Sequence, residues 1–375
     1  MTRKTWRTAA SLGVTVALAL LVPPVTAAQS GSGDRLPGMP PLLDARDVYA
    51  AARPGSTSPA AQDAVARVYV PNSGSATVDV IDPATFTVVD HFAVGSEPQH
   101  VTPSYDLKTL WVVADHGDSL TRIDPLTGHQ DRTVKVEDPY NLYFTPDGRY
   151  AIVVAERKKR LDFRDAQTLK MINPLPVPCR GIDHMDFTAN GRFLLASCEF
   201  SSEMLKVDVE RQRVAGSLKL PGQGMPQDVR LSPDGSAFFV ADMAANGVYV
   251  IDANELKILG FIPTGKAAHG LYFSRDSKRL FVSNRGEGSI SVIDVAARRV
   301  AVTWLIPNGG SPDMGGVSAD GRVLWLSGRY NSEVYAIDAA DGHLLARIRV
   351  GKGPHGLCVW PQPGRYSLGH TGIMR

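Results

Sequence analysis

The 375-residue chain carries few charged side chains and no excess of either sign. Charged residues make up 21% of the sequence, and 40 basic against 38 acidic residues give a formal net charge of +2 at pH 7. Proteins that coat nucleic acid, or bind membranes through a polybasic surface, carry a much larger positive excess. We therefore expect neither of these classes, and no nucleic-acid partner.

Motifs that would identify a particular chemistry are also missing. The three cysteines, Cys179, Cys198 and Cys358, form no Cys-x-x-Cys-His segment, so any haem would have to be held without covalent attachment. The chain contains no Gly-x-Ser-x-Gly segment and no glycine-rich phosphate loop between a strand and a helix. These absences argue against an α/β-hydrolase and a nucleotide-dependent enzyme.

A hydrophobic run long enough to span a membrane is lacking as well. Ala9 to Val22 is apolar but has only 14 residues, whereas a spanning helix needs ~20. Three basic residues precede this run and the small residues Thr26-Ala27-Ala28 follow it, which is typical of a secretory signal peptide. We predict that residues 1–28 are removed on export, that no transmembrane segment remains, and that the protein is periplasmic or secreted.

Glycine and proline, in contrast, are plentiful. The chain has 35 Gly and 26 Pro, as expected for many tight turns between short strands. In residues 29–65 they occur together with Ala and Ser and without apolar periodicity. We predict a mobile tether over residues 29–65, and a separate C-terminal tail over residues 362–375.

One sequence motif recurs through the rest of the chain. It consists of a start residue, usually Pro, followed by a polar pair, an apolar strand, a tight turn, a second apolar strand and a segment that ends in Ile-Asp. Its copies begin 41 to 44 residues apart, at Pro98, Pro139, Ile182, Pro226, Ala268, Pro312 and Pro354. A period of about 40 to 45 residues is typical of propeller blades. The runs are short, alternating and rich in Val and Ile, which argues against a helical array of the same period.

Seven copies predict an all-β, seven-bladed β-propeller over residues 66–361. Only one strand follows the last start at Pro354, whereas Arg67 to Asn72 matches the second strand of a blade. We therefore expect the N- and C-terminal strands to pair in one blade, with Leu357 to Trp360 innermost. Such closure removes exposed sheet edges, and we expect a monomer.

Several of these strands resemble a known family. Tyr69-Val70-Pro71-Asn72, Phe281-Val282-Ser283-Asn284 and Ser291-Val292-Ile293-Asp294 are similar to the repeats of YVTN β-propellers, and the order of motifs resembles that of YncE-like exported bacterial proteins. The resemblance also extends, more distantly, to the haem d1 propeller of cytochrome cd1 nitrite reductase, to seven-bladed lactonases and to streptogramin lyases. It rests on strand and turn residues, so it implies the fold and does not choose a function.

The two residues after each blade start should surround the mouth of the central channel. They include four of the nine histidines, and the candidate ligand-binding residues are Gln99, His100, Asn141, Asp183, His184, Gln227, Asp228, His269, Asp313 and His355. The candidate metal ligands are His100, His184, His269 and His355, and imidazole favours iron, copper or zinc over calcium. A non-covalent haem is the other cofactor considered. The alternative is that these residues bond backbone groups and channel water.

Three further features of the sequence lead to separate expectations. Cys179 and Cys198 lie on adjacent strands of one blade and could form a disulfide in an oxidising compartment, whereas Cys358 should be a buried thiol. The basic run over residues 157–160 could capture an anion or could be a solvated loop. His370 follows a strand that crosses to the opposite face, so we expect it to lie far from the channel mouth.

No catalytic motif identifies an enzyme. The leading hypothesis is an exported binding or scaffold protein that holds a small ligand, a metal cofactor or an envelope protein at the channel mouth. The second is an enzyme at the same funnel, either lactonase-like or lyase-like with a divalent metal, or a haem-d1-type redox or cofactor-assembly protein. A purely structural scaffold is the third.

Overall fold

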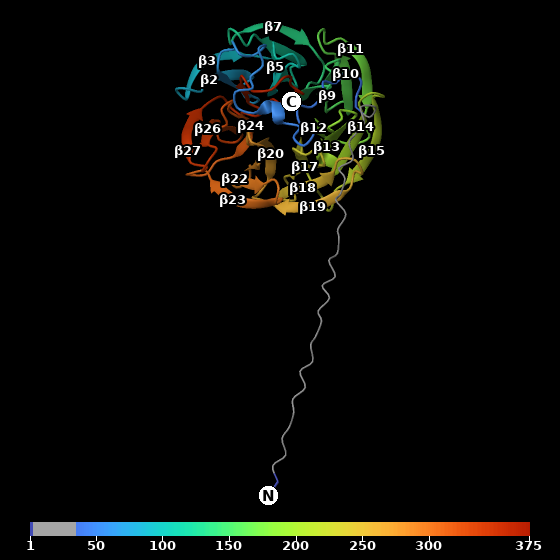
Figure 1. Cartoon of the computed structure of the whole chain (residues 1–375). Coiled ribbons are helices and arrows are strands. Elements are labelled where there is room, and N and C mark those ends of the chain that lie inside the picture. The colour runs from blue at the N-terminus through green and yellow to red at the C-terminus, as the bar shows by residue number, and fades with distance from the viewer. Residues whose placement is uncertain (3–34) are drawn as a thin grey trace. The chain divides into compact units, whose positions relative to one another are not determined.

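Each sequence repeat folds into a four-stranded antiparallel sheet, and seven such sheets stand around a central axis (Figure 1). The computed structural model describes residues 1–2 and 35–375, so the predicted signal peptide falls almost wholly outside the described residues. Residues 35–375 form one unit. Within the described residues, no helix has the length and apolar character to cross a membrane.

The strands of each blade follow the chain from the channel outward, except in the closing blade. The innermost strands are β4 (Pro98–Pro103), β8 (Asn141–Phe144), β12 (Ile182–Phe187), β16 (Pro226–Leu231), β20 (Ala268–Phe273), β24 (Pro312–Val317) and β28 (Cys358–Trp360). The second strands are β5 (Leu110–Ala114), β9 (Tyr150–Ala155), β13 (Phe193–Cys198), β17 (Ala237–Asp242), β21 (Arg279–Asn284), β25 (Val323–Gly328) and β1 (Arg67–Asn72).

The outer half of each blade is more exposed. The third strands are β6 (Ser119–Ile123), β10 (Arg160–Asp165), β14 (Glu203–Asp208), β18 (Gly247–Asp252), β22 (Ser289–Asp294), β26 (Glu333–Asp338) and β2 (Thr77–Asp82). The outermost are β7 (Gln130–Lys135), β11 (Met171–Pro176), β15 (Arg213–Lys219), β19 (Ile258–Pro263), β23 (Arg299–Leu305), β27 (Leu344–Arg349) and β3 (Thr87–Ala93). Inner strands such as β16 are buried at every residue, whereas β15 alternates between exposed and half-buried positions, because neighbouring blades cover only the inner strands on both faces.

The predicted ring closure is confirmed. Strand β28 pairs antiparallel with β1, with Val359 opposite Val68 and Cys358 opposite Tyr69. The closing blade has the order β28-β1-β2-β3, so the last strand of the chain lies innermost and the first strand lies beside it.

The segment before the propeller differs from the predicted tether. In its described part, Leu36, Met39, Val48 and Tyr49 are buried, and residues 50–52 form the short 3-10 helix η1 (Ala50–Ala52). Its backbone bonds to turns at the ends of the blades, for example from Val48 N to Pro233 O at 2.7 Å. The apolar residues lack a period because they fill separate depressions between blades, so the sequence pattern suggested a linker.

The C-terminal segment is not a free tail either. After β28 it forms a hairpin in which Leu368 N donates to Ile373 O at 2.8 Å. The hairpin lies against strand β8, with bonds from Phe144 N to Leu368 O (3.0 Å) and from His370 N to Leu142 O (2.8 Å). Its turn therefore enters the central channel, and the C-terminus lies near the middle of the ring (Figure 1). We call residues 365–375 the tail hairpin.

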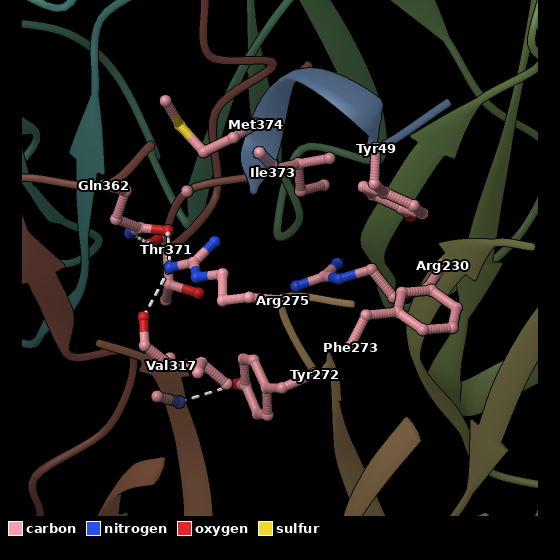
Figure 2. Close-up of a pocket in the computed structure, with 14 residues that line it drawn as sticks. Tyr49, Arg230, Tyr272, Phe273, Arg275, Val317, Gln362, Thr371, Ile373 and Met374 are labelled. Carbon is pink, nitrogen blue, oxygen red and sulfur yellow. Dashed lines mark hydrogen bonds between the residues drawn. The ribbon is translucent and has the colours of Figure 1, made fainter. Parts of the chain in front are cut away.

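A small cavity marks the place where the tail hairpin, the N-terminal segment and the blades meet (Figure 2). Its polar lining is bonded within the protein: Arg275 donates to the carbonyl of Val317, and Gln362 Nε2 donates to Thr371 O at 2.8 Å. Nearby, the Arg375 guanidinium donates to Asp186 at 2.9 Å and lies over the ring of Tyr49. These contacts hold the tail hairpin on this face of the ring.

Candidate functional site

The ten predicted ligand-binding residues all lie buried around the channel. His100, His184, His269 and His355 are 0–2% exposed. The register of five inner strands shifts at the blade start, for example between Ile182 and Met185. Such a bulge changes the direction in which the neighbouring side chains point. In these blades it directs the polar pair at the blade start toward the channel.

Serine side chains on the second strands support these bulges. Ser197 Oγ accepts from His184 N at 3.1 Å, and Ser283 Oγ accepts from Gly270 N at 2.8 Å. The backbone donors freed by the register shift are thus bonded inside the blade. The inner-strand backbone is thereby fixed where the histidines project.

Three imidazoles converge at the centre of the channel. The ring centroids of His100, His184 and His370 lie 5.4 Å (His100–His184), 5.0 Å (His100–His370) and 4.9 Å (His184–His370) apart. One ring nitrogen of each lies within 4.8 Å of the others. All three Nε2 atoms are buried and form no hydrogen bond among the described residues, although His184 Nε2 lies 3.2 Å from Asp183 Oδ1. We call this group the three-histidine cluster.

His370 belongs to this cluster, so the sequence-based prediction that it lies far from the channel mouth is wrong. The tail hairpin turns back into the channel and carries His370 to its centre. The sequence held one signal, since Gly369 and Gly372 flank the pair His370-Thr371 and both adopt positive φ, as a tight turn requires. The local sequence does not indicate which face of the propeller this turn contacts.

The Nδ1 atoms of the cluster are held by the protein. His100 Nδ1 lies 3.1 Å from Tyr140 O. A carbonyl only accepts, so Nδ1 carries the proton and Nε2 carries a lone pair. Asn141 Nδ2 lies 3.1 Å from His184 Nδ1 and 3.0 Å from His370 Nδ1, while its Oδ1 accepts from Leu142 N at 2.9 Å. An amide NH2 donates, so in this orientation both Nδ1 atoms accept and the protons of His184 and His370 lie on Nε2. Exchanging the amide nitrogen and oxygen reverses this assignment.

A second group lies next to the three-histidine cluster and comprises His269, Asp313 and His355, with ligand atoms within 4.8 Å of one another. His269 Nδ1 lies 2.9 Å and His355 Nε2 lies 3.6 Å from the Asp313 carboxylate. The rings of His100 and His355 are 4.9 Å apart, so the two groups adjoin.

Burial keeps these imidazoles neutral. It lowers the pKa of His100 to about 3 and that of His269 to about 4. In the second group the neighbouring cations and imidazoles, His269 and Arg285 first, outweigh burial and hold the pKa of Asp313 well below its usual range. The channel therefore presents neutral ring nitrogens beside an ionised carboxylate.

The remaining predicted residues have different roles. Asp228 accepts from Val229 N, Leu271 N and Arg230 Nη1 at 2.7–2.9 Å, so it joins two blades rather than facing a ligand. Asp183, in contrast, forms no hydrogen bond at either carboxylate oxygen among the described residues, but its Oδ1 lies 3.2 Å from His184 Nε2. Gln99, Asn141 and Gln227 are buried beside the rings.

Carboxylates gather on the side of the channel where the inner strands begin. Burial, followed by a hydrogen bond to Asp138, raises the pKa of Asp115 to about 7. Burial and repulsion from Asp115 and Glu199 raise the pKa of Glu156 to about 7. The pKa of Asp183 is raised by burial and by repulsion from Glu199 and Glu156. A cation bound nearby would relieve this repulsion.

The basic run over residues 157–160 does not form an open anion site. Arg157 Nε bonds Asp138 at 2.7 Å, and Arg160 Nε bonds Asp162 at 2.6 Å. These charges are neutralised by neighbouring carboxylates, as expected for a surface loop.

The predicted disulfide is present. Cys179 and Cys198 are bonded, with Cα atoms 6.0 Å apart. The bond ties the end of β13 to the segment before β12, the strand that carries His184. Cys358 is buried and not bonded to another cysteine, and burial raises the pKa of its thiol.

Comparison with known proteins places this ring in a family. Residues 41–363 match the YNCE-like beta-propeller family. The chain belongs to this family. YncE of Salmonella typhimurium is 21% identical over 267 residues, which cover 67% of this chain and 74% of the relative. YncE of Salmonella typhi is 23% identical over 248 residues, which cover 58% of this chain and 69% of the relative.

Solved structures share the fold of this YNCE-like chain. Dihydro-heme d1 dehydrogenase NirN, in complex with DHE, is 18% identical with a TM-score of 0.60, and the match covers 86% of this chain and 82% of that one. Kuenenia stuttgartiensis hydrazine synthase is 18% identical with a TM-score of 0.62, covering 74% and 94%. The resemblance to YncE-like and haem-d1-type propellers is confirmed, and at these identities the structures show the fold alone.

Proposed function

We propose that this protein is an exported binding protein that holds a transition-metal ion in its central channel, coordinated by His100, His184 and His370. The observation that carries the proposal is the convergence of three buried imidazoles, one ring nitrogen of each within 4.8 Å of the others, whose Nε2 atoms have no hydrogen bond among the described residues. A buried polar atom without a partner costs about 1–3 kcal/mol. A bound ion would satisfy all three at once.

The spacing of these nitrogens suits a single ion. An imidazole nitrogen binds a zinc-like metal at about 2.0–2.1 Å, so two nitrogens on one ion lie at most about 4.2 Å apart. The cluster nitrogens lie within 4.8 Å of one another, and small side-chain rotations bring them into range. Imidazole favours zinc, copper, iron or nickel over calcium or magnesium.

The second shell of the cluster also fits this function. Ligating histidines usually donate their other ring N–H to a carbonyl or carboxylate, as His100 does to Tyr140 O. At His184 and His370 the atom that faces Nδ1 is Asn141 Nδ2, so an ion at their Nε2 atoms would require this amide to turn its oxygen toward the rings. One asparagine would then orient two ligands.

The spacing of the rings favours an ion over a haem. Neighbouring imidazoles lie 4.9–5.4 Å apart within the cluster, and a macrocycle is wider than this spacing. The tail hairpin also fills the channel on one side. We therefore favour metal binding over the haem-d1-type alternative.

The test is the metal content of the mature protein, isolated from its export compartment without chelators or a histidine tag, by elemental mass spectrometry. We expect about one equivalent or more of zinc, copper or iron, and the loss of one equivalent in His370→Ala. The matched control is His129→Ala, since His129 is exposed, and it should keep the full content. A wild-type protein with far less than one equivalent, which also fails to bind added zinc, would overturn the proposal.

A further inference from the structure

We propose that the channel contains a second metal position, held by His355 Nε2 and Asp313 Oδ2 with His269 as a third ligand, so that the site is a two-metal centre. This inference rests on the proposed function only in that the two positions share one channel. It is carried by separate residues and a separate observation.

The tautomer of His355 is fixed by its backbone partner. His355 Nδ1 lies 3.2 Å from Gln99 O. Because a carbonyl oxygen only accepts, Nδ1 carries the proton and Nε2 of the neutral ring carries a lone pair. This ring nitrogen is therefore free to act as a ligand.

That lone pair faces a carboxylate oxygen. His355 Nε2 and Asp313 Oδ2 lie 3.6 Å apart, and Oδ2 is buried without a hydrogen-bond partner among the described residues. Two acceptors that face each other inside a protein repel unless a cation lies between them. With ligand distances of about 2.0–2.2 Å, a separation of 3.6 Å corresponds to a nitrogen–metal–oxygen angle of about 120°.

The rest of the carboxylate is already positioned. Arg285 Nη1 donates to Asp313 Oδ1 at 3.2 Å, and His269 Nδ1 lies 2.9 Å from the same oxygen. Hydrogen bonding of a ligating carboxylate by a neighbouring side chain is typical of metal sites. Oδ1 is thus held by Arg285, whereas Oδ2 forms no hydrogen bond among the described residues.

The two positions share one wall of the channel, because the rings of His100 and His355 are 4.9 Å apart. They also differ in ligand chemistry. Three imidazoles form one site, and two imidazoles with a carboxylate form the other, a set that also suits iron(II).

The inference is tested by titrating chelator-treated full-length protein with zinc and measuring the bound equivalents after gel filtration. The wild type should bind two. Asp313→Asn, which keeps the shape of the side chain, and His355→Gln should each bind one, and so should His370→Ala. His129→Ala should bind two. Circular dichroism of the metal-free variants verifies that each is folded.

The outcomes separate the two proposals. A wild type that binds one equivalent, which is lost in His370→Ala and kept in Asp313→Asn and His355→Gln, overturns the second position and leaves the first intact. Two equivalents that survive both Asp313→Asn and His355→Gln also overturn it. Binding of no zinc overturns both positions. Loading with copper(II) gives an independent readout, because spin coupling between the ions should appear in the wild type and vanish in His355→Gln.

Discussion

The partners of individual ring nitrogens decide what each channel histidine can do. His100 and His355 donate Nδ1 protons to the carbonyls of Tyr140 and Gln99, which leaves Nε2 lone pairs turned to the centre. Both carbonyls belong to residues at blade starts, as the two histidines do. The repeat therefore supplies each histidine together with the backbone group that orients it. The positions of the histidines could be predicted from the repeat spacing, whereas their tautomers depend on contacts between blades.

At the same scale, the carboxylates near the mouth predict a pH dependence. Glu156 has a pKa raised to about 7, mainly by burial, against a usual value of about 4.3 for an unfolded glutamate. The folded state therefore binds more protons between these values, and stability falls as pH rises through them. We expect Glu156→Gln to reduce the fall in Tm of the metal-free protein between pH 5 and pH 8.

The measurement is thermal unfolding by circular dichroism across this pH range. Glu210→Gln serves as the control, since Glu210 is exposed on the surface, and it should keep the wild-type slope. A Glu156→Gln slope equal to the wild-type slope would show that this carboxyl titrates normally.

Among the elements, the blades and the two terminal segments differ in how far the sequence predicts them. Each blade repeats its strands and turns with a period of 41–44 residues, so all seven blades and the closing strand could be predicted. Residues 35–66 and 365–375 pack on surfaces that exist only after the ring has formed. Their apolar residues follow no period, and the contribution of His370 was missed for the same reason.

The packing of the tail hairpin leads to a prediction about this element. Gly369 has φ +97°, and a Cβ there would lie against the carbonyl oxygen of Leu142 and 2.5 Å from Tyr143 Cα. We expect Gly369→Ala to displace the hairpin, to withdraw His370 and to remove one equivalent of bound metal. Carboxypeptidase digestion, followed by mass spectrometry, should shorten this variant faster than the wild type.

The matched control is Gly222→Ala. Gly222 also has a positive φ, of +69°, but a Cβ there would meet no atom within 4 Å. It therefore tests backbone strain without a clash. If both variants keep the full metal content, the hairpin is not needed for the site.

On the scale of the whole molecule, the channel joins all seven blades and the tail hairpin at one point. The proposed ligands come from β4, β12, β20, β24, the segment before β28 and the hairpin, so a bound ion would connect elements far apart in the chain. Such a ligand binds the folded state alone and stabilises it by mass action.

We therefore expect metal to raise the melting temperature. Zinc at 100 times its Kd should add about 2.7 kcal/mol to the free energy of unfolding, a rise of several degrees. Differential scanning fluorimetry of the metal-free protein measures this shift. Calcium should give none, because imidazoles bind it poorly, and the zinc shift should shrink in His184→Ala. An equal shift with calcium would point to the surface carboxylates instead.

The order of the ligands along the chain has a consequence for metal loading. His355 and His370 come after every other ligand, and the channel that gathers them exists only once β28 has paired with β1. Before the ring closes, the histidines are therefore separate from one another, and the chain binds a metal ion more weakly than the closed ring would. On the proposed function, an exported chain would therefore select its ion where the ring closes, from the metals available in that compartment and not in the one where the chain is made.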